Sequence, residues 1–332
     1  MLDIVITHYK EPWEVGEKLF QMIGLQRCVN MDDIHVTVVN DGGHELPEEK
    51  LAALSYPVKQ LNIPHAGVSA ARNAGIDAAT EPWIMFCDFD DNFATIYALR
   101  EIMNVLHTEE YDMLWSVIVA ENLIKGREVI YKIPEAQRFV FCHGKVYRRE
   151  FLIEQNIRFD TELTFNEDSC FNNVIIARTN YKRIGEIRSM FNLYSWIRRE
   201  NSVTNSGRDD EATLGHFRRN LKVTEENRLN REPECYNGMV TRTVYDTYYM
   251  VHGKRISDGM KRQILDEFTP WIAERIDVFG KVDDDTLQRL VTVSKMELID
   301  HDEIVYDAFE LVDKWVHDIV NTFRTGGELG EN

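Results

Sequence analysis

The stretch GVSAARNAGIDAATEPWIMFCDFDD, residues 67–91, decides the fold. Its first half predicts a helix over Gly67–Ala79 with Ser69 as its cap, since serine favours that position. The apolar run Trp83–Cys87 has the length and composition of a buried strand, and charged residues follow it directly. A helix that leads into such a strand is typical of parallel α/β sheets, which bind ligands at the carboxyl ends of their strands.

The residues before this stretch repeat the same order. Strands are predicted at Leu2–Thr7, Ile34–Val39 and Val58–Ile63, and helices near Pro12 and Glu48. Strands that alternate with helices over about 90 residues indicate a parallel, doubly wound α/β sheet. The polar clusters THY, NDG and DFDD then all lie at carboxyl strand ends, where this architecture binds its ligands.

The pattern changes in the middle of the chain. Further strands are predicted at Met113–Val119, Glu128–Ile133 and Phe139–Cys142, and helices at Arg148–Asn156 and Asp168–Arg178. We therefore expect the α/β domain to extend over residues 1–205.

The remainder of the chain is predicted to be helical. We expect a C-terminal helical domain over residues 206–325 and a disordered tail over 326–332. An apolar stripe at helical spacing is formed by Ile304, Ala308, Leu311, Trp315 and Ile319. We expect this stripe to pack on the body of the protein, with a second subunit, in a homodimer, as the alternative.

The composition excludes several classes of protein. Of 332 residues, 44% are hydrophobic and 28% are charged, which supports a large buried core and excludes a disordered or collagen-like chain. With 38 basic and 56 acidic residues the net charge is −18, which argues against a broad non-specific grip on DNA or on an anionic membrane.

The cysteines and the apolar segments predict a cytoplasmic protein. The five cysteines are scattered without a C-x-x-C pair, so reduced thiols are expected rather than disulfides or a zinc site. The N-terminus lacks the basic region of a signal peptide, and no apolar run approaches the roughly 20 residues of a membrane span.

The cluster Asp88-Phe89-Asp90-Asp91 is the first candidate for chemistry. Three carboxylates within four residues repel one another, and a bound divalent cation is a natural reason to tolerate them. Such hard oxygen ligands suit Mg²⁺ or Mn²⁺. The alternative is a turn with a helix cap, because aspartate favours those positions.

Two further residues lie at the same edge of the predicted sheet. Asp41 ends a strand, where it can accept hydrogen bonds from a base or ribose; its alternative is an Asx turn with Gly42. Arg72 lies on the first turns of a helix that aims it at the carboxylates or at a phosphate, and its alternative is an exposed helix arginine.

Two later segments complete the candidate site. Glu167 and Asp168 begin a helix and offer a general base, or simply compensate the helix dipole. Because helix neighbours point about 100° apart, only one of the two is expected to face a bound substrate. The stretch YSWIRRENSVT, residues 194–204, is a basic, hydroxyl-rich loop able to hold a diphosphate; the alternative is a polar linker.

Taken in order, the motifs THY, NDGG, GVSAARNAG, DFDD, NED and RRENSVT resemble family 2 glycosyltransferases of the GT-A fold. The resemblance covers about residues 1–205 and includes HGKVYRREF, residues 143–151. It implies an α/β, Rossmann-like mixed sheet of the nucleotide-diphospho-sugar transferase type. It also implies inverting transfer of a sugar from a nucleoside-diphosphate sugar, a UDP-sugar above all, to an acceptor hydroxyl.

The resemblance assigns the nucleoside to the first strand ends. Thr7, His8 and Tyr9 line the base pocket, and Asp41 contacts the uracil or its equivalent. Asp88 faces the ribose.

It also assigns the reacting part of the site. Arg72 supports the carboxylates, and Asp90 coordinates the Mn²⁺ or Mg²⁺ that bridges the donor diphosphate, with Asp91 as a helper. Asp168 is the base that deprotonates the acceptor hydroxyl.

The late loop both follows and departs from the family pattern. Arg199 and Ser202 lie over the diphosphate, whereas Asn201 stands where relatives often place a metal-binding histidine. Asn40 replaces a frequent aspartate. No Q-x-x-R-W processivity motif is present, which predicts addition of a single sugar.

The sequence leaves alternatives open for the acceptor and for the class of enzyme. A cell-surface glycan or its precursor is expected as acceptor, with a modified base in phage-type DNA as the alternative. A local basic run could track DNA phosphates, although a solvated helix face is the preferred reading of it: Arg208, Arg218, Arg219, Lys222, Arg228 and Arg231. A haloacid-dehalogenase-type phosphatase also uses D-x-D, although on its first strand, and an inactive sugar-nucleotide binding protein is the third reading.

Overall fold

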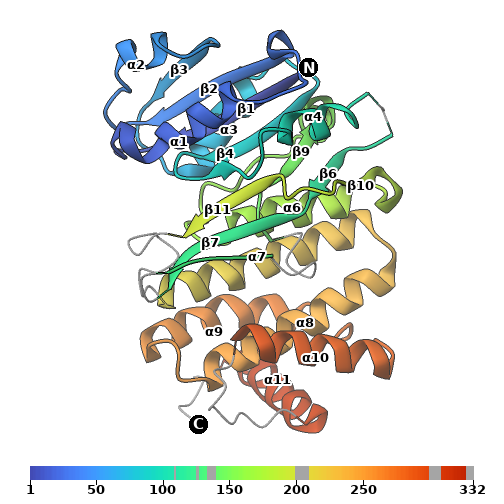
Figure 1. The fold of residues 1–332 in the computed structure, drawn as a ribbon. Coiled ribbons are helices and arrows are strands. Elements are labelled where there is room, and N and C mark those ends of the chain that lie inside the picture. Colours follow the sequence, from blue (N-terminus) through green and yellow to red (C-terminus); the bar gives the residue numbers. More distant parts are fainter. Residues whose placement is uncertain (108–109, 125–126, 133–139, 199–208, 299–307, 327–332) are drawn as a thin grey trace. The chain divides into compact units, whose positions relative to one another are not determined.

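The computed structural model contains two compact units, Met1–Ser206 and Gly207–Asn332, which are described separately (Figure 1). It describes every residue of the chain except 108–109, 125–126, 133–139, 199–208, 299–307 and 327–332. The predicted disordered tail therefore lies outside the described residues except for Gly326, and Ile304 lies outside them as well.

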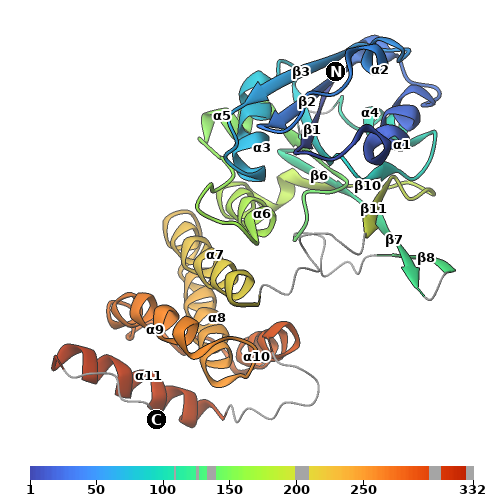
Figure 2. The same ribbon diagram turned by 90° about the vertical axis from the view of Figure 1, so that its left-hand side faces the viewer.

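The first unit begins with the predicted alternation of strands and helices, which is confirmed. Its elements are β1 (Leu2–His8), α1 (Trp13–Gly24), β2 (Ile34–Asp41), α2 (Glu48–Ala52), β3 (Val58–Ile63), α3 (Val68–Ala78) and β4 (Trp83–Asp88). Strands β3, β2 and β1 lie side by side in this order (Figure 2), β4 follows on the other side of β1, and all four run parallel to one another.

Three later strands extend the same sheet beyond β4: β9 (Lys145–Arg148), β6 (Met113–Ser116) and β10 (Ile184–Ile187). Strand β9 runs antiparallel to both of its neighbours, whereas β6 and β10 are parallel to each other. The sheet is therefore mixed, as the resemblance implies, and not parallel throughout.

A smaller sheet follows, with the order β5 (Asn92–Phe93), β11 (Tyr194–Arg198), β7 (Ile118–Ile124) and β8 (Arg127–Lys132). The single strand predicted at Met113–Val119 is wrong, because β6 and β7 belong to different sheets. One apolar run supplies both, and only long-range pairing separates them.

The strand predicted at Phe139–Cys142 is also wrong for its described part. Side chains of Lys145 and Asn172 donate to the carbonyl of Phe141, and the amide of Cys142 donates to Asp168. The backbone groups that a strand would pair are thus bonded to side chains.

Helices pack on both faces of the large sheet. Alternate residues of β1 face opposite clusters: Ile4 and Ile6 pack with Phe20 of α1, whereas Val5 packs with Ile76 of α3. The remaining helices of this unit are α4 (Ala98–Met103), α5 (Arg149–Glu154) and α6 (Glu167–Arg178). The period of two in β1 follows from burial on both faces.

The cap predicted for α3 is wrong. The helix begins at Val68 and its cap is Gly67, whose φ of 91° suits a residue without a Cβ, while Ser69 lies inside the first turn. The Gly67 amide at the start of the helix donates a hydrogen bond to Asp41, so a carboxylate from another segment satisfies a backbone group that a capping side chain usually satisfies.

The second unit is helical, as predicted. Its helices are α7 (Asp209–Asn230), α8 (Pro233–His252), α9 (Asp258–Ala273), α10 (Asp284–Leu298) and α11 (Phe309–Arg324). They enclose an apolar core that includes Phe217, Val244 and Phe268. Within the described residues, no helix combines the length and apolar character that a membrane crossing needs.

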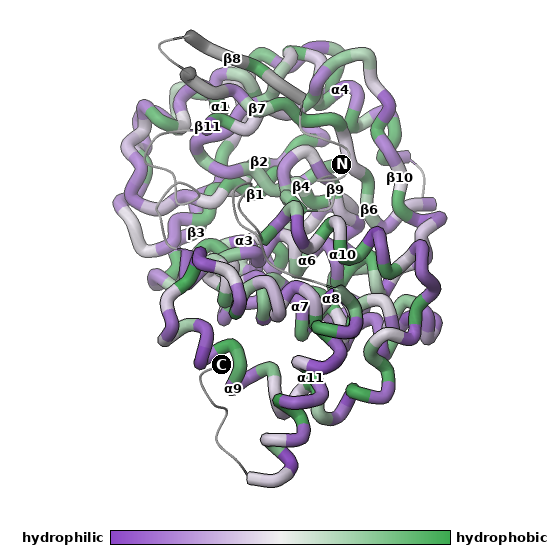
Figure 3. The backbone as a smooth tube through the Cα atoms, turned by 90° about the horizontal axis from the view of Figure 1, so that it is seen from below, coloured by the Kyte–Doolittle hydropathy of each residue, from purple (hydrophilic) through white to green (hydrophobic). Residues whose placement is uncertain are grey.

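The apolar stripe predicted for the last helix is right for Trp315 and Ile319, which pack in the core of this unit, and wrong for Ala308 and Leu311, which are exposed. The hydropathy of α11 alternates along the chain (Figure 3), but its buried face is formed by Val312, Val316, Ile319 and Val320. Leu311 is 43% exposed. Valines spaced four residues apart offer a second stripe, which the packing selects.

Candidate functional site

The candidate site lies where the strand order reverses beside β1. Thr7 is opposite Asp88 of β4, and His8 is opposite Asn40 of β2. Thr7 Oγ1 donates to Asp88 Oδ1 at 3.3 Å. The predicted polar clusters therefore meet at one edge of the sheet, as parallel strands require.

Asp41 has no unused carboxylate oxygen in this arrangement. Its Oδ1 accepts from the Ala66 amide at 2.7 Å, and its Oδ2 accepts from the Gly67 amide at 2.9 Å. The Asx turn is made by its neighbour instead, since Asn40 Oδ1 accepts from the Gly43 amide at 3.0 Å. Asp41 thus anchors the loop before α3.

The two residues after Thr7 have different surroundings. His8 is 2% exposed, packs on Phe89 and bonds through Nε2 to the carbonyl of Glu11 at 2.8 Å. Tyr9 instead stacks on His65, with ring centroids 4.2 Å apart and planes 10° apart. Of the three residues predicted for the base pocket, Tyr9 therefore forms an aromatic pair with His65, which was not singled out from the sequence.

Arg72 is buried among carboxylates. Its Nη2 lies 3.1 Å from Asp88 Oδ1, and its Nη1 lies 3.0 Å from Glu167 Oε1 and 2.5 Å from Asp168 Oδ1. It is 3% exposed, so the alternative of an exposed helix arginine is wrong. Burial works against the charge, but the three carboxylates prevail and raise the pKa of Arg72 further.

Glu167 and Asp168 both bond to the guanidinium of Arg72. Asp168 Oδ2 also accepts from the Cys142 amide at 3.0 Å. Burial, and then the charge of Asp168, raise the pKa of Glu167 to about 7. The preceding Asn166 is left-handed, with φ of 63°, and turns the chain into α6.

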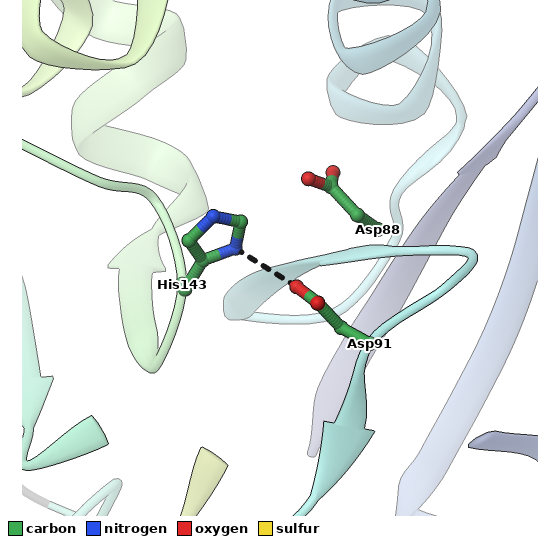
Figure 4. A group of neighbouring side chains, drawn as sticks. All are labelled: Asp88, Asp91 and His143. Carbon is green, nitrogen blue, oxygen red and sulfur yellow. Dashed lines mark ion pairs between the residues drawn. The ribbon is translucent and has the colours of Figure 1, made fainter. Parts of the chain in front are cut away.

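Asp88, Asp91 and His143 form a group able to hold a metal ion (Figure 4). One ligand atom from each lies within 4.8 Å of the others, and His143 Nδ1 is 3.2 Å from Asp91 Oδ2. Asp91 is positioned by the Tyr194 hydroxyl and the Ile197 amide, each at 2.9 Å. The two carboxylates are hard oxygen ligands of the kind that suits Mn²⁺ or Mg²⁺, and the imidazole is a further nitrogen ligand for a divalent cation.

The electrostatics of this group fit a cation. Burial, with the charges of Asp88 and Asp90, raises the pKa of Asp91 well above its ordinary value, which a positive ion would offset. Burial lowers the pKa of His143, and the neutral imidazole is the form that binds metals. Burial would raise the pKa of Asp88, but Arg72 outweighs it and keeps that pKa low.

The predicted metal ligands are only partly brought together. Asp91 belongs to the group, whereas Asp90 is half-buried beside it and is not one of its three members. His143 was not identified from the sequence as a possible metal ligand, although HGK begins a block that resembles the family. The spacing between His143 and the DFDD cluster follows no known metal-binding pattern. The predicted diphosphate contacts Arg199 and Ser202, with Asn201, lie outside the described residues.

Comparisons with known proteins identify the family of the chain. The model of the family described as Glycosyl transferase family 2 matches residues 3–170, which is half of the chain. The uncharacterized glycosyltransferase YibD of Escherichia coli K12 is 25% identical over 277 residues, which cover 73% of this chain and 78% of YibD.

A second relative is the minor teichoic acid biosynthesis protein GgaA of Bacillus subtilis, 24% identical over 209 residues. The match covers 56% of this chain and 45% of GgaA, so the chain spans about half the length of that relative.

Among solved structures, residues 1–349 of S. aureus TarS in complex with UDP have a TM-score of 0.64 and 15% identity, over 100% of this chain and 93% of that one. This likeness confirms the predicted GT-A fold. With the fold, the strand-end carboxylates and the family match in agreement, the chain belongs to glycosyl transferase family 2 and is a glycosyltransferase.

Proposed function

We propose that the enzyme transfers a single sugar from a nucleoside-diphosphate sugar, a UDP-sugar, to an acceptor hydroxyl with inversion. The observation that carries this proposal is Arg72, which joins Asp88 at the donor edge to Asp168 at the start of α6. TarS has been solved with UDP and with UDP-GlcNAc, which supports a uridine nucleotide.

The donor would lie along the ends of β1, β2 and β4. Tyr9 and His65 offer an aromatic surface for the base, and Asp88, whose side chain is 31% exposed, is accessible to the ribose. Arg199 and Ser202 are proposed to contact the diphosphate, because arginine donates in the fork geometry that phosphate oxygens accept.

Asp88, Asp91 and His143 would hold the cation, with Asp90 as a further candidate ligand. When bound, Mn²⁺ or Mg²⁺ supplies positive charge that offsets the charge on the departing nucleoside diphosphate. Tyr194 hydrogen-bonds to Asp91 and so keeps one ligand oriented.

Asp168 is proposed as the general base. It takes the proton of the acceptor hydroxyl while that oxygen bonds to the anomeric carbon and the bond to the diphosphate breaks. This single displacement from the opposite face inverts the anomeric configuration. Arg72 and the Cys142 amide each bond to one oxygen of Asp168, which fixes the orientation of its carboxylate.

The helical unit is proposed to select the acceptor, a cell-surface glycan or its precursor. The name of GgaA, a teichoic acid biosynthesis protein, supports that class. The DNA alternative loses support, because Arg218 pairs with Glu267 and Arg228 pairs with Glu225.

A homodimer through the C-terminal helices is a separate proposal, which sedimentation equilibrium tests.

A donor screen tests the proposed function. The purified chain is incubated with UDP-, GDP- and dTDP-sugars and Mn²⁺, and products are identified by mass spectrometry. We expect a nucleoside diphosphate and a transferred or hydrolysed sugar, with near-complete loss in EDTA or in Asp90→Asn. Release of inorganic phosphate alone, or full turnover in EDTA, would contradict the proposal.

A further inference from the structure

His65 has an unused ring nitrogen at the place proposed for the nucleobase. We infer that His65 Nε2 accepts a hydrogen bond from a ring N–H of the donor base. The enzyme would then take uracil, thymine or guanine, which carry such a hydrogen, and would disfavour cytosine and adenine, which do not. This inference rests on the proposed function and names the residue that selects the base of its donor.

The tautomer of His65 follows from its partners. Nδ1 lies 2.8 Å from Asp41 Oδ2 and 3.1 Å from the backbone carbonyl oxygen of Asp41. Both oxygens can only accept, so Nδ1 carries the hydrogen. In the neutral imidazole Nε2 is then an acceptor, and no hydrogen bond to Nε2 forms within the described part of the chain.

Asp41 is engaged in holding this loop. Its two carboxylate oxygens accept from the amides of Ala66 and Gly67 as well as from His65, and its side chain is 5% exposed. The base contact that the resemblance assigns to Asp41 therefore passes to His65, and Asp41 acts as its positioning residue.

The ring of His65 is held in place and remains accessible. Gly42 has φ of 72°, and a Cβ there would lie 2.6 Å from the His65 amide nitrogen, so the two loops can approach only with glycine. On one side the imidazole stacks on Tyr9. Its side chain is nonetheless 54% exposed, so a ligand can reach Nε2.

This geometry distinguishes the bases by hydrogen-bond chemistry. Uracil and thymine present N3–H and guanine presents N1–H, each of which matches a lone pair on Nε2. Cytosine and adenine present a lone pair at the equivalent ring nitrogen, so two acceptors would face each other. Leaving such a group unpaired reduces affinity by about 10- to 100-fold.

The test measures equilibrium binding of UDP, CDP and N3-methyl-UDP to the full chain with Mn²⁺, by isothermal titration calorimetry. We expect wild type to bind UDP about 10- to 100-fold more tightly than either analogue. His65→Phe keeps a flat ring, whereas His65→Ala removes it. In both variants we expect weaker binding of UDP and a ratio of UDP to CDP affinity of about threefold or less, because the hydrogen bond to Nε2 is lost.

A matched control is His317→Phe, since His317 is a similarly exposed histidine on α11 whose replacement should leave all three affinities unchanged. UDP binding without preference over CDP in wild type overturns this inference alone. A preference that survives in both His65 variants overturns it as well. If wild type binds no nucleoside diphosphate, the proposed function fails first and takes the inference with it.

Discussion

Arg72 Nη1 lies 2.5 Å from Asp168 Oδ1, which joins the start of α3 to the start of α6 across 96 residues of chain. The other terminal nitrogen of the same guanidinium bonds to Asp88 at the end of β4. One buried cation therefore orients both the proposed base and a carboxylate of the donor edge. Removing a group from this cluster should change catalysis and stability in separable ways.

Asp168→Asn keeps the shape of the side chain but cannot take a proton. We expect turnover to fall by roughly 10²–10⁴-fold, while UDP-sugar affinity stays within a few-fold, because the donor contacts lie elsewhere. Glu167→Gln serves as the matched variant and should retain more activity. A dead Glu167→Gln beside a normally active Asp168→Asn would reverse the assignment.

Arg72→Met should destabilise the fold by about 3–5 kcal/mol, because it leaves three partly buried carboxylates without their cation. Urea unfolding followed by circular dichroism measures this. Arg158→Met is the control, since Arg158 pairs with the exposed Asp77 and should cost less than about 1 kcal/mol. If both variants lose the same unfolding free energy, the buried ion pairs of Arg72 stabilise the fold no more than an exposed ion pair does.

Glu167 should make the stability depend on pH. Its pKa is about 7 in the folded chain against 4.5 ordinarily, so the folded state binds this proton more tightly. Stability contributed by the protonated carboxyl is complete below pH 4.5 and is lost as pH rises through 7. Glu167→Gln should gain up to about 3 kcal/mol over wild type between pH 5 and pH 8. Urea unfolding of both proteins at pH 5 and pH 8 measures this. A difference in unfolding free energy between Glu167→Gln and wild type that is the same at both pH values would refute the prediction.

His143→Ala should weaken Mn²⁺ binding at least about tenfold, as expected for the loss of an imidazole ligand or of its support to Asp91. Calorimetric titration of Mn²⁺ in the presence of UDP measures it without reference to activity. His317→Ala provides a histidine control on the helical unit. Unchanged Mn²⁺ affinity in His143→Ala would exclude His143 from the metal site.

Asp246 should be the most sensitive carboxylate of the helical unit. It is fully buried; burial would raise its pKa, but Arg242 and His216 outweigh burial and hold the pKa far below the ordinary 3.8. Its stabilising effect is therefore present above pH 3.8 and fades as pH falls below it. Asp246→Ala should cost about 3–5 kcal/mol in urea unfolding. Asp313→Ala, in an exposed pair with His317, is the control and should cost little.

The sequence alone determined the α/β alternation of the first 88 residues, the helical C-terminal unit and the edge at which the polar clusters meet. These features follow from local periodicity and from the direction of parallel strands, which need no knowledge of distant contacts. The motif order was also sufficient to place the chain in its family.

Only the tertiary structure decided which partners the site residues have. The phase of α11, the separation of β6 from β7 and the antiparallel β9 all depend on packing between segments far apart in sequence. Likewise, His65 is given its tautomer by a carboxylate 24 residues away, and His143 meets Asp91 from a separate loop. Hydrogen bonds and ion pairs of this kind are set by distance in space, which no spacing along the chain encodes.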